Sequence, residues 1–353
     1  MTRPLRHHSN LRQGNQKMTS IKEFKVCIAE FNGIGIDVSK AHLDICGLNL
    51  MKHESLALDN EEGGIHRLCK ALVRGGYREK IIMESTGYYH WLCAVILAEA
   101  GLDVRIVNPL LASKHHKGSI RGSKTDELDA YRLATMAQTE RDLPKAWEGD
   151  RKWVELRHKV GILCAIDKTL QKLKSSLNSH KEALRIMGVS CDPMLDEIEQ
   201  QTRALRRTYD KQKQALGVEL GALSLADHDR IAAIPGVSPF VSGLMCLLLR
   251  QDVKSNRAWI AFAGLDIRVK ESGQWKGKGK LGKRGNAYLR KILYQTAWGL
   301  KQHDPGFKTY YQRLKDQGRP YVESLLMIAR KFLRICFVLV KTGQNYNPDM
   351  VNA

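Results

Sequence analysis

The chain has 353 residues, and its 57 lysines and arginines against 37 aspartates and glutamates leave a net charge of +20 at pH 7. This surplus predicts a polyanionic partner, for which nucleic acid is the natural candidate and an anionic membrane the competitor. No segment supports the membrane, because charged residues interrupt the most apolar late stretch, 323–341, which is typical of an amphipathic core helix. The length predicts two or three domains.

Residues 1–32 are polar and basic at first, which predicts a basic disordered extension with Met18 as an alternative start. From residue 33 the pattern changes to three short strands within 33–60, followed by a helix, a strand, a helix, a strand and a helix. We expect the last strand to stop at Pro109 and the last helix to begin at Thr125 as its N-cap. Residues 33–150 are thus predicted to form a mixed α/β sheet domain.

Residues 151–222 carry leucines at heptad spacing on both sides of a break at 188–193. This pattern predicts a coiled-coil helical hairpin or a seam between subunits, with burial inside one domain as the plainer alternative. Residues 223–346 are predicted to form a mainly helical domain, followed by a tail at 347–353. The motif IPGV at 234–237 resembles a helix-hairpin-helix turn that could hold a phosphate, and a plain interhelical turn is equally compatible with it.

The eight cysteines form no CxxC pair and no Cys/His cluster with zinc spacing. Several of them lie in apolar runs, as Cys93 does in WLCAVIL. This pattern favours reduced, buried thiols in a cytosolic protein. The N-terminus shows no apolar signal region.

Four carboxylates stand out by their positions. Asp37 and Glu84 end two strands, and acids at the carboxyl ends of adjacent strands face the same crevice. Asp126 and Asp129 are three residues apart on a predicted helix and so share one face of it. Packed carboxylates repel unless a cation lies between them, and Mg²⁺ or Mn²⁺ would take such oxygen ligands and assist phosphodiester chemistry. For any one of these acids alone, a helix cap or a solvated position is an ordinary explanation.

Ser272 precedes a glycine-rich basic run. The run would neutralise phosphates, and its glycines would let the backbone approach DNA closely. A serine hydroxyl needs an activating base or metal, and no histidine lies within the stretch. On the residues alone, a basic surface loop with an incidental serine is the preferred interpretation. The candidate nucleic-acid-binding cations are Lys276, Lys278, Lys280, Lys283, Arg284, Arg290 and Lys291.

In the expected order, the motifs GIDVSK, MESTG, VNP, KTDELDA, IPGVSPF, FAGLDIRVKESG, KRGNAYLRKIL and RKFLRICFVLVKTGQNY run through residues 33–346. The chain thereby resembles the IS-one-ten-type insertion-sequence transposases, relatives of the Piv DNA invertases. The resemblance implies an RNase H/RuvC-like domain whose Mg²⁺-binding Asp-Glu-Asp-Asp tetrad maps to Asp37, Glu84, Asp126 and Asp129. It also implies a nucleophilic serine that links covalently to DNA, and this serine maps to Ser272.

The resemblance further implies the partners. Members of the family use a structured non-coding guide RNA, the bridge RNA, which pairs with donor and target DNA. They assemble as tetramers, joined in part by the coiled coil, and a RuvC-like site of one subunit completes a composite site with the serine of another. We therefore expect a bacterial or archaeal protein of the cytoplasm, associated with the nucleoid. One departure is Gly282, where many members have serine, and it puts a secondary contact in doubt.

Three functions compete at this point. The leading hypothesis is an RNA-guided DNA recombinase or transposase, which would form a covalent protein–DNA adduct. A metal-dependent endonuclease of the Holliday-junction-resolvase type would need the tetrad but no serine. A catalytically dead nucleic-acid-binding protein would keep the charge without cleaving, and the intact acids at all four tetrad positions argue against it.

Overall fold

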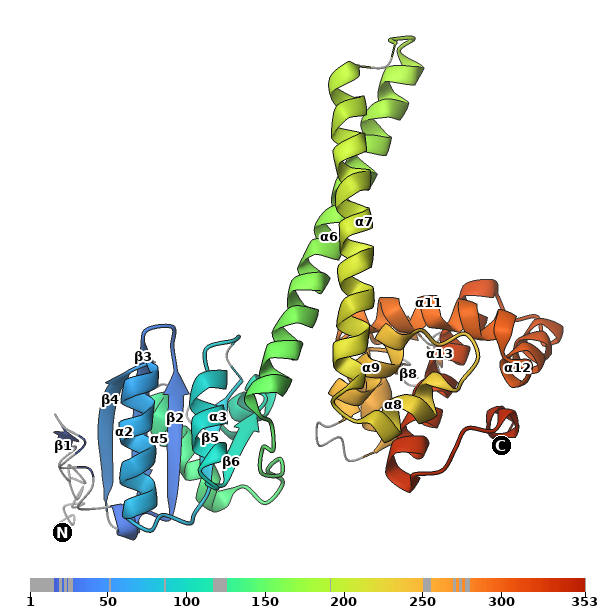
Figure 1. Cartoon of the computed structure of the whole chain (residues 1–353). Coiled ribbons are helices and arrows are strands. Elements are labelled where there is room, and N and C mark those ends of the chain that lie inside the picture. Colours follow the sequence, from blue (N-terminus) through green and yellow to red (C-terminus); the bar gives the residue numbers. More distant parts are fainter. Residues whose placement is uncertain are drawn as a thin grey trace, which may run out of the picture. The chain divides into compact units, whose positions relative to one another are not determined.

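The computed structural model of the chain is shown in Figure 1. By its internal contacts the chain divides into two compact units, Met1–Val154 and Glu155–Ala353, here called unit 1 and unit 2. None of the helices among the described residues is long and apolar enough to cross a membrane. The structure describes residues 16–18, 21, 24, 28–50, 52–85, 87–116, 126–190, 192–249, 255–268, 271–272, 275–276 and 280–352.

Unit 1 is built on a six-stranded sheet of order β1-β4-β3-β2-β5-β6. The pairs β2–β3 and β3–β4 are antiparallel, whereas β5 and β6 extend the sheet in parallel from β2, and β1 pairs in parallel with β4. This is the mixed α/β domain that the sequence predicts. Its strands are β1 (Gln16–Met18), β2 (Gly33–Val38), β3 (His42–Leu48), β4 (His53–Asp59), β5 (Ile81–Glu84) and β6 (Val104–Val107).

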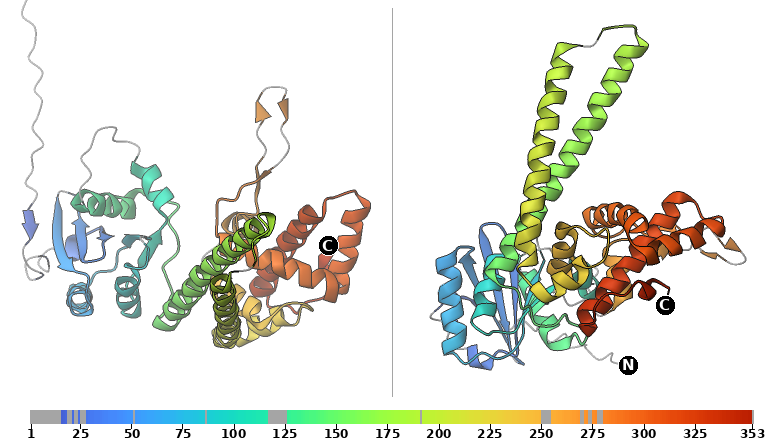
Figure 2. Two further views of the ribbon diagram at one scale, coloured as in Figure 1. Left: turned by 90° about the horizontal axis from the view of Figure 1, so that it is seen from above. Right: turned by 45° about the vertical axis from the view of Figure 1, so that its right-hand side comes forward.

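Helices cover both faces of this sheet (Figures 1 and 2). Helices α2 and α3 lie on one face, where their apolar side chains join the main core of the unit with those of β2. Helix α5 lies on the opposite face and packs on β2, β3 and β5. The helical elements are η1 (Ile28–Glu30), α2 (Glu62–Arg74), α3 (Trp91–Glu99), α4 (Pro109–His116) and α5 (Asp126–Thr139).

The alternation of residues in β2 explains this arrangement. Ile34 and Ile36 are fully buried on the face covered by α2 and α3, so Gly33 and Gly35 face α5. A Cβ atom added at Gly35 would lie 2.1 Å from the carbonyl oxygen of Ala130, which means that only glycine fits there. The two glycines therefore let α5 rest directly on the strand.

One detail of unit 1 differs from the sequence predictions. The segment predicted to be disordered through residue 32 contributes Phe24, Ile28 and Phe31 to the core, because apolar side chains at spacings of four and three residues form a stripe amid the polar sequence. The strand β6 ends just before Pro109, as predicted, and Pro109 also begins α4, where the missing N–H of proline costs nothing. Thr125, the predicted N-cap of α5, lies outside the described residues.

Unit 2 contains a long helical hairpin whose arms run antiparallel (Figure 2). Its arms are α6 (Arg151–Ile186), which begins at the end of unit 1, and α7 (Pro193–Gly221). The heptad leucines of α6 are buried, so the predicted hairpin forms and the heptad stripe packs within the chain. Asp192 caps α7 by accepting a hydrogen bond from the Met194 N–H at 2.9 Å.

The remaining helices of unit 2 form a body that packs against the base of this hairpin. Helix α7 contacts α9 along its last turns, and the Tyr209 hydroxyl lies 3.2 Å from that of Tyr288 on α11. These contacts join the hairpin to the C-terminal helices, which the sequence analysis had treated as separate domains. The elements are α8 (Leu225–Ala232), α9 (Pro239–Leu249), α10 (Asn256–Phe262), α11 (Ala287–His303), α12 (Pro305–Asp316), α13 (Tyr321–Thr342) and η2 (Pro348–Val351).

The residues predicted to be a tail also pack onto this body. Val351 is buried, and Gly306 at the start of α12 approaches the backbone of Pro348 so closely that a Cβ atom would lie 2.5 Å from its carbonyl oxygen. Between α10 and α11, the described residues form four two-residue strands. They are β7 (Ile267–Arg268), β8 (Glu271–Ser272), β9 (Trp275–Lys276) and β10 (Lys280–Leu281), with β7 pairing with β10 and β8 with β9.

Candidate active site

Asp37 and Glu84 lie side by side at the carboxyl ends of two parallel strands. The register of β2 and β5 pairs Gly35 with Ile82 and Ile36 with Met83, so Asp37 and Glu84 come next on their strands. Because alternate residues share a face, Asp37 lies on the same face as Gly35, and Glu84 on the same face as Ile82. Ile82 packs with Leu133 of α5. Both carboxylates therefore belong to the face that α5 covers.

The first turn of α5 brings the other two carboxylates to this place. Asp126 is the first residue of the helix, and Asp129 follows three residues later. The amino end of a helix favours negative charge, which makes acids at these positions locally stable. Since the next turn, at Ala130, rests on Gly35, the helix start lies over the strand end that carries Asp37.

The pKa of Asp37 shows that these four side chains act on one another. Burial raises this pKa from 3.8 to about 6, helped by the charges of Asp129, Asp126 and, more weakly, Glu84. The Val38 N–H donates a 3.0 Å hydrogen bond to Asp37 Oδ1, which opposes the rise. The sequence prediction that the four acids converge is consistent with this coupling.

The four carboxylates lie within electrostatic reach rather than at ligand spacing. Asp129 Oδ1 is 2.8 Å from Arg132 Nη1 one turn along α5. Within the described ranges, no three His, Cys, Asp or Glu side chains are grouped closely enough to hold a metal ion. The donor set nevertheless fits a hard divalent cation, because carboxylate oxygens are its preferred ligands and a cation would relieve the repulsion that adds to the effect of burial on the Asp37 pKa.

The raised pKa of Asp37, caused by burial and then by the neighbouring charges, has a measurable consequence for stability. Because the pKa of Asp37 is raised, its stabilising contribution is complete below pH 3.8 and is lost as the pH rises through 6. Two pKa units correspond to about 3 kcal/mol, reduced to about 1–2 kcal/mol because Asp37 is only half-buried and solvent screens it. In metal-free buffer, Asp37→Asn should therefore raise the melting temperature at pH 7.5 and have little effect at pH 4.5.

Thermal denaturation of the full chain in the presence of a chelator tests this prediction. Asp59→Asn is the matched control, because Asp59 ends β4 with a side chain that is 73% exposed, and it should not change the melting temperature in the same way. A lower melting temperature of Asp37→Asn at pH 7.5 would contradict the coupling.

Asp44 lies closer to this site than the sequence analysis supposed. The sequence alone gives Asp44 the character of an ordinary solvated acid, but the β2–β3 ladder pairs it directly with Asp37. Opposite residues of an antiparallel pair lie on the same face of the sheet. The signal was present in the sequence, since both residues stand at similar distances from the turn at 39–41 that joins the two strands.

The segment that carries Ser272 belongs to unit 2. Ser272 is the second residue of β8, whose partner strand β9 contains Lys276. The side chains of Ser272, Lys276 and Lys280 and the whole of Lys278 lie outside the described part of the chain. Just after this segment, Lys283 and Arg284 are exposed to solvent.

Two of the cations predicted to bind nucleic acid make contacts within unit 2. Arg290 Nη1 donates a 3.1 Å hydrogen bond to the Ala263 carbonyl at the end of α10. Lys291 Nζ lies 2.5 Å from Oδ2 of the buried Asp167 on α6. Arg290 therefore ties α11 to α10, and Lys291 ties it to the hairpin.

Gly282, where the sequence departs from the family pattern, lies against Asp266. Its N–H donates a 2.8 Å hydrogen bond to the Asp266 carbonyl, which holds β10 beside β7. A Cβ atom at Gly282 would lie 2.4 Å from Asp266 Oδ1. A serine here would require the carboxylate to move, so in this chain the space that a serine side chain would need is taken by Asp266.

Family comparisons bear on both units. A model described as "Transposase" matches residues 34–184, and one described as "Transposase IS116/IS110/IS902 family" matches residues 228–312. Together they cover about two thirds of the chain. The chain belongs to the IS110 family of transposases. It is therefore an enzyme of the transposase and DNA recombinase class, as the motifs predicted. The first match contains the four carboxylates and the second contains Ser272.

Relatives of this IS110-family transposase fall into two groups by name. A 43.6 kDa protein of insertion element IS110 from Streptomyces coelicolor is 25% identical over 145 residues, which are 40% of this chain and 36% of that protein. A 42 kDa protein of insertion element IS900 from Mycobacterium paratuberculosis is 22% identical, over 90% of this chain and 98% of its own length. The pilin gene-inverting protein of Moraxella lacunata is 23% identical, over 89% of this chain and 97% of its own length.

Proposed function

We propose that this transposase is an RNA-guided DNA recombinase that cleaves and rejoins strands through a serine nucleophile and an acidic metal site. The observation that carries the proposal is the convergence of four carboxylates from β2, β5 and the first turn of α5, in which burial and the charges of the other three raise the pKa of Asp37. The strand order of unit 1 supports an RNase H/RuvC-like domain for this site. The proposed partners are donor DNA, target DNA and a structured guide RNA of the bridge type.

Asp37, Glu84, Asp126 and Asp129 would hold Mg²⁺, or Mn²⁺ in its place. Such an ion supplies positive charge to phosphate oxygens and to the attacking and leaving oxygens of a phosphodiester. The fold positions these carboxylates before a cation binds. Helix α5 rests on Gly35 and Gly33, and this contact fixes Asp126 and Asp129 relative to the strand ends. The basic run after Ser272 would screen the phosphates of the strand being cut.

In the proposed strand exchange, each phosphoester bond that breaks is matched by one that forms. Ser272 Oγ forms a bond to a backbone phosphorus, the bond from that phosphorus to one deoxyribose oxygen breaks, and the serine proton ends on the released hydroxyl. Attack by a hydroxyl of another strand reverses these steps and frees the serine. No high-energy cofactor is needed, because the phosphodiester energy is kept in the phosphoserine bond.

The name of the Moraxella lacunata relative supports this reaction class. That protein is called a pilin gene-inverting protein, and inversion of a DNA segment requires strands to be cut and joined to new partners. The similarity extends over nearly all of that protein and over both units of this chain. A hydrolytic nuclease of the resolvase type would leave cut ends instead.

The guide RNA can be tested first. The full chain should be purified from cells of its natural host, the RNA that remains bound should be sequenced, and that RNA should be added to the protein with Mg²⁺ and DNA substrates matching its loops. We expect recombinant junctions, detected by sequencing, only when guide and DNA match. Junctions that form equally well without the RNA would contradict guidance, and cut ends without junctions would favour the resolvase type.

The hairpin offers a surface for the proposed tetramer. Ile162 of α6 and Leu205 of α7 are 60% and 49% exposed, and both line an apolar groove of about 280 Å³ between the two helices. The buried heptad residue Leu170 already packs inside the hairpin. Within this groove, Ile162 and Leu205 are the exposed large apolar residues that a second copy could cover.

Charges on this surface should reduce the assembly. The double variant Ile162→Asp with Leu205→Asp should sediment as smaller particles with unchanged helix content, because burying two carboxylates against another subunit costs several kcal/mol, on the order of 2–5. Lys172→Asp is the control, since it adds negative charge to an exposed position of α6 outside the groove. An unchanged mass of the double variant would move the subunit contact elsewhere.

A further inference from the structure

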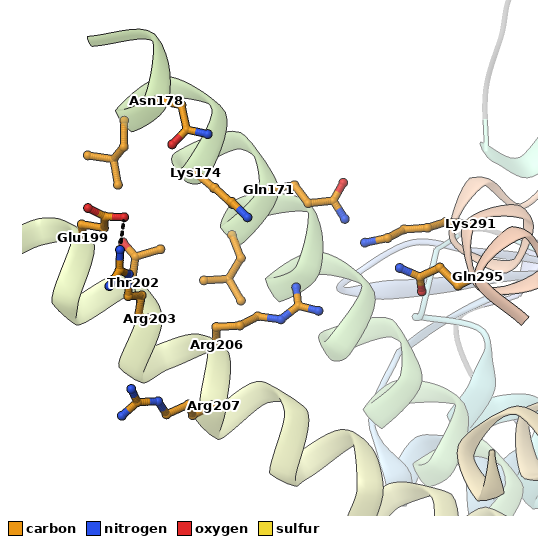
Figure 3. A pocket seen from close by; sticks show the side chains of 12 residues that line it. Gln171, Lys174, Asn178, Glu199, Thr202, Arg203, Arg206, Arg207, Lys291 and Gln295 are labelled. Atoms are coloured by element: carbon orange, nitrogen blue, oxygen red, sulfur yellow. Dashed lines mark hydrogen bonds and ion pairs between the residues drawn. The ribbon is translucent and has the colours of Figure 1, made fainter. Parts of the chain in front are cut away.

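A basic groove of about 800 Å³ lies in unit 2 between the hairpin and α11 (Figure 3). Arg206 reaches from α7 toward α6, and Lys291 reaches toward α6 from α11 (Figure 3). Among the described residues that line the groove, one is a carboxylate, Glu199. Five are cations, namely Lys174, Arg203, Arg206, Arg207 and Lys291. Arg203 pairs with Glu199 at 2.7 Å and Arg206 with Asp210 at 3.3 Å, so the exposed Lys174 and Arg207 provide most of the positive charge that the groove offers to an anion.

Asp167 holds two of these cations in position. Its side chain is 3% exposed, and it accepts from Lys291 Nζ at 2.5 Å and from Arg206 Nη1 at 3.3 Å. Gln171 Nε2 donates to the same carboxylate at 2.9 Å. Asp167 is not among the residues that line the groove. It therefore orders two long cationic side chains before any ligand arrives, which lowers the entropic cost of binding.

The outer face of α11 continues from the groove to an exposed tryptophan. Lys291, Gln295 and Trp298 follow at spacings of four and three residues, so they lie on one face of the helix. The inner face is buried through Ile292 and Leu293, whereas Trp298 is 50% exposed. A helix rises 1.5 Å per residue, which places Trp298 about 10 Å along the axis from Lys291.

A second cation lies on α11 next to this tryptophan. Lys301, three residues after Trp298, holds its Nζ 4.7 Å from the ring centre of Tyr311 and 5.0 Å from that of Tyr321. Tyr321 is 43% exposed. Cations and exposed aromatic rings thus alternate along this surface, as on proteins that bind single-stranded nucleic acid.

We propose that this surface binds a single-stranded segment of nucleic acid. The cations of the groove contact consecutive phosphates, and Trp298 stacks on a base. The 10 Å between Lys291 and Trp298 spans about three stacked nucleotides at about 3.4 Å each. A double helix would not fit this use, because its bases are stacked on one another and do not offer a face to Trp298. The surface is called the α11 track, and it consists of Lys174, Arg206, Arg207, Lys291, Gln295 and Trp298.

The α11 track goes beyond the proposed strand exchange, because it contains neither a tetrad residue nor Ser272. The track binds a strand that is unpaired during strand exchange or during pairing with the guide. DNA and RNA strands share the chemistry that the track recognises, namely a phosphodiester backbone and a base with a free face. The experiment distinguishes the two.

The test measures binding of the full chain to labelled single strands of about 12 nucleotides, as DNA and as RNA of one sequence, across a salt series. Trp298→Ala should weaken binding about 5- to 150-fold without changing the slope of log affinity against log salt. Trp298→Phe should retain most of the wild-type affinity, because phenylalanine also offers an aromatic face to a base. Lys174→Ala with Arg207→Ala should reduce that slope by about 1.4, or 0.7 for each lost phosphate contact.

The matched control is Lys172→Ala with Lys315→Ala, which removes the same charge from exposed positions outside the groove and should leave the slope unchanged. If Trp298→Ala weakens binding to both DNA and RNA, the track accepts single strands of either kind. If it weakens binding to only one of them, the track is specific for that nucleic acid. Single-strand binding by Trp298→Ala that equals wild type would overturn the proposal. So would an equal loss of duplex binding. Strand cleavage is measured in a separate assay, so failure of the single-strand-binding proposal would not contradict the proposed strand exchange.

Discussion

Asp37→Asn is expected to reduce strand cleavage at least about 100-fold, the loss typical of removing one group that stabilises transition-state charge. The reason is that the variant removes one negative oxygen from the four-carboxylate cluster and so weakens its hold on a divalent cation. The measurement is cleavage of end-labelled DNA by the full chain with guide RNA and Mg²⁺, resolved on a denaturing gel. Glu84→Gln should behave alike, since Glu84 lies beside Asp37 at the end of β5.

The control for this experiment comes from the same turn of α5. Glu127 lies between Asp126 and Asp129, and its charge acts on the buried Cys46, whose pKa burial and Glu127 raise to about 12. Glu127→Gln should cleave like wild type. Cleavage at the wild-type rate by both Asp37→Asn and Glu84→Gln would rule out the tetrad.

Asp37→Asn should combine this loss of cleavage with the gain in metal-free stability described above. A carboxylate whose pKa is raised by its neighbours destabilises the folded protein when it is ionised, and the same carboxylate is needed to hold a cation. The gain in stability follows from the burial of Asp37 and from the neighbouring charges, and the loss of cleavage follows from the missing ligand oxygen. A variant that lost cleavage and also melted earlier would instead indicate damage to unit 1.

Ser272→Ala is expected to abolish the covalent protein–DNA adduct. Only a hydroxyl at the attacking position can form the phosphoserine bond, and the substitution removes one oxygen without altering the charge of the basic run. Wild-type protein, quenched in denaturant, should give a slow-migrating band that protease removes, and the alanine variant should give none. Ser272→Cys should retain weak activity, because a thiolate is itself a nucleophile.

A serine remote from the segment provides the matched control. Ser176 is exposed on α6, and Ser176→Ala should form the adduct at the wild-type level. An adduct that persists in Ser272→Ala would assign the nucleophile to another residue. If wild type cuts DNA and never forms the band, the resolvase-type reaction is the better explanation.

Much of unit 1 follows from local patterns in the sequence. The alternation of Ile34 and Ile36 with Gly33 and Gly35 predicts a strand, and the same alternation decides which face Asp37 occupies. Asp37 and Glu84 each come at the end of an apolar strand, which was enough to predict that they lie together. The carboxylates were thus predictable because each owes its place to its own strand or helix.

The hairpin was predictable for a similar reason. Leucines at heptad spacing from Leu156 to Leu177 specify one buried stripe on α6. The same spacing cannot tell a partner arm of the same chain from a second subunit. That choice depended on the packing of α7 back along α6, which makes the buried stripe an internal one.

Other features depended on residues far apart in the chain. Lys291 belongs to a run that the sequence assigns to nucleic acid, and only the folded chain shows that its Nζ also contacts Asp167, 124 positions earlier. Arg290 similarly donates to the Ala263 carbonyl rather than facing solvent alone. No local pattern encodes such pairs, because they arise where the hairpin, α10 and α11 happen to meet.

The sequence by itself determined the element order, the face of each amphipathic element and the four strand-end and helix-start acids, since these depend on residues within one or two turns or strands. The tertiary structure alone decided that Lys291 pairs with Asp167, that Phe24 and Ile28 join the core, and that Trp298 continues a basic groove. These features depend on which surfaces touch. Contact between distant segments is set by the packing of whole elements, and burial of their combined apolar area outweighs the local preference of any single residue.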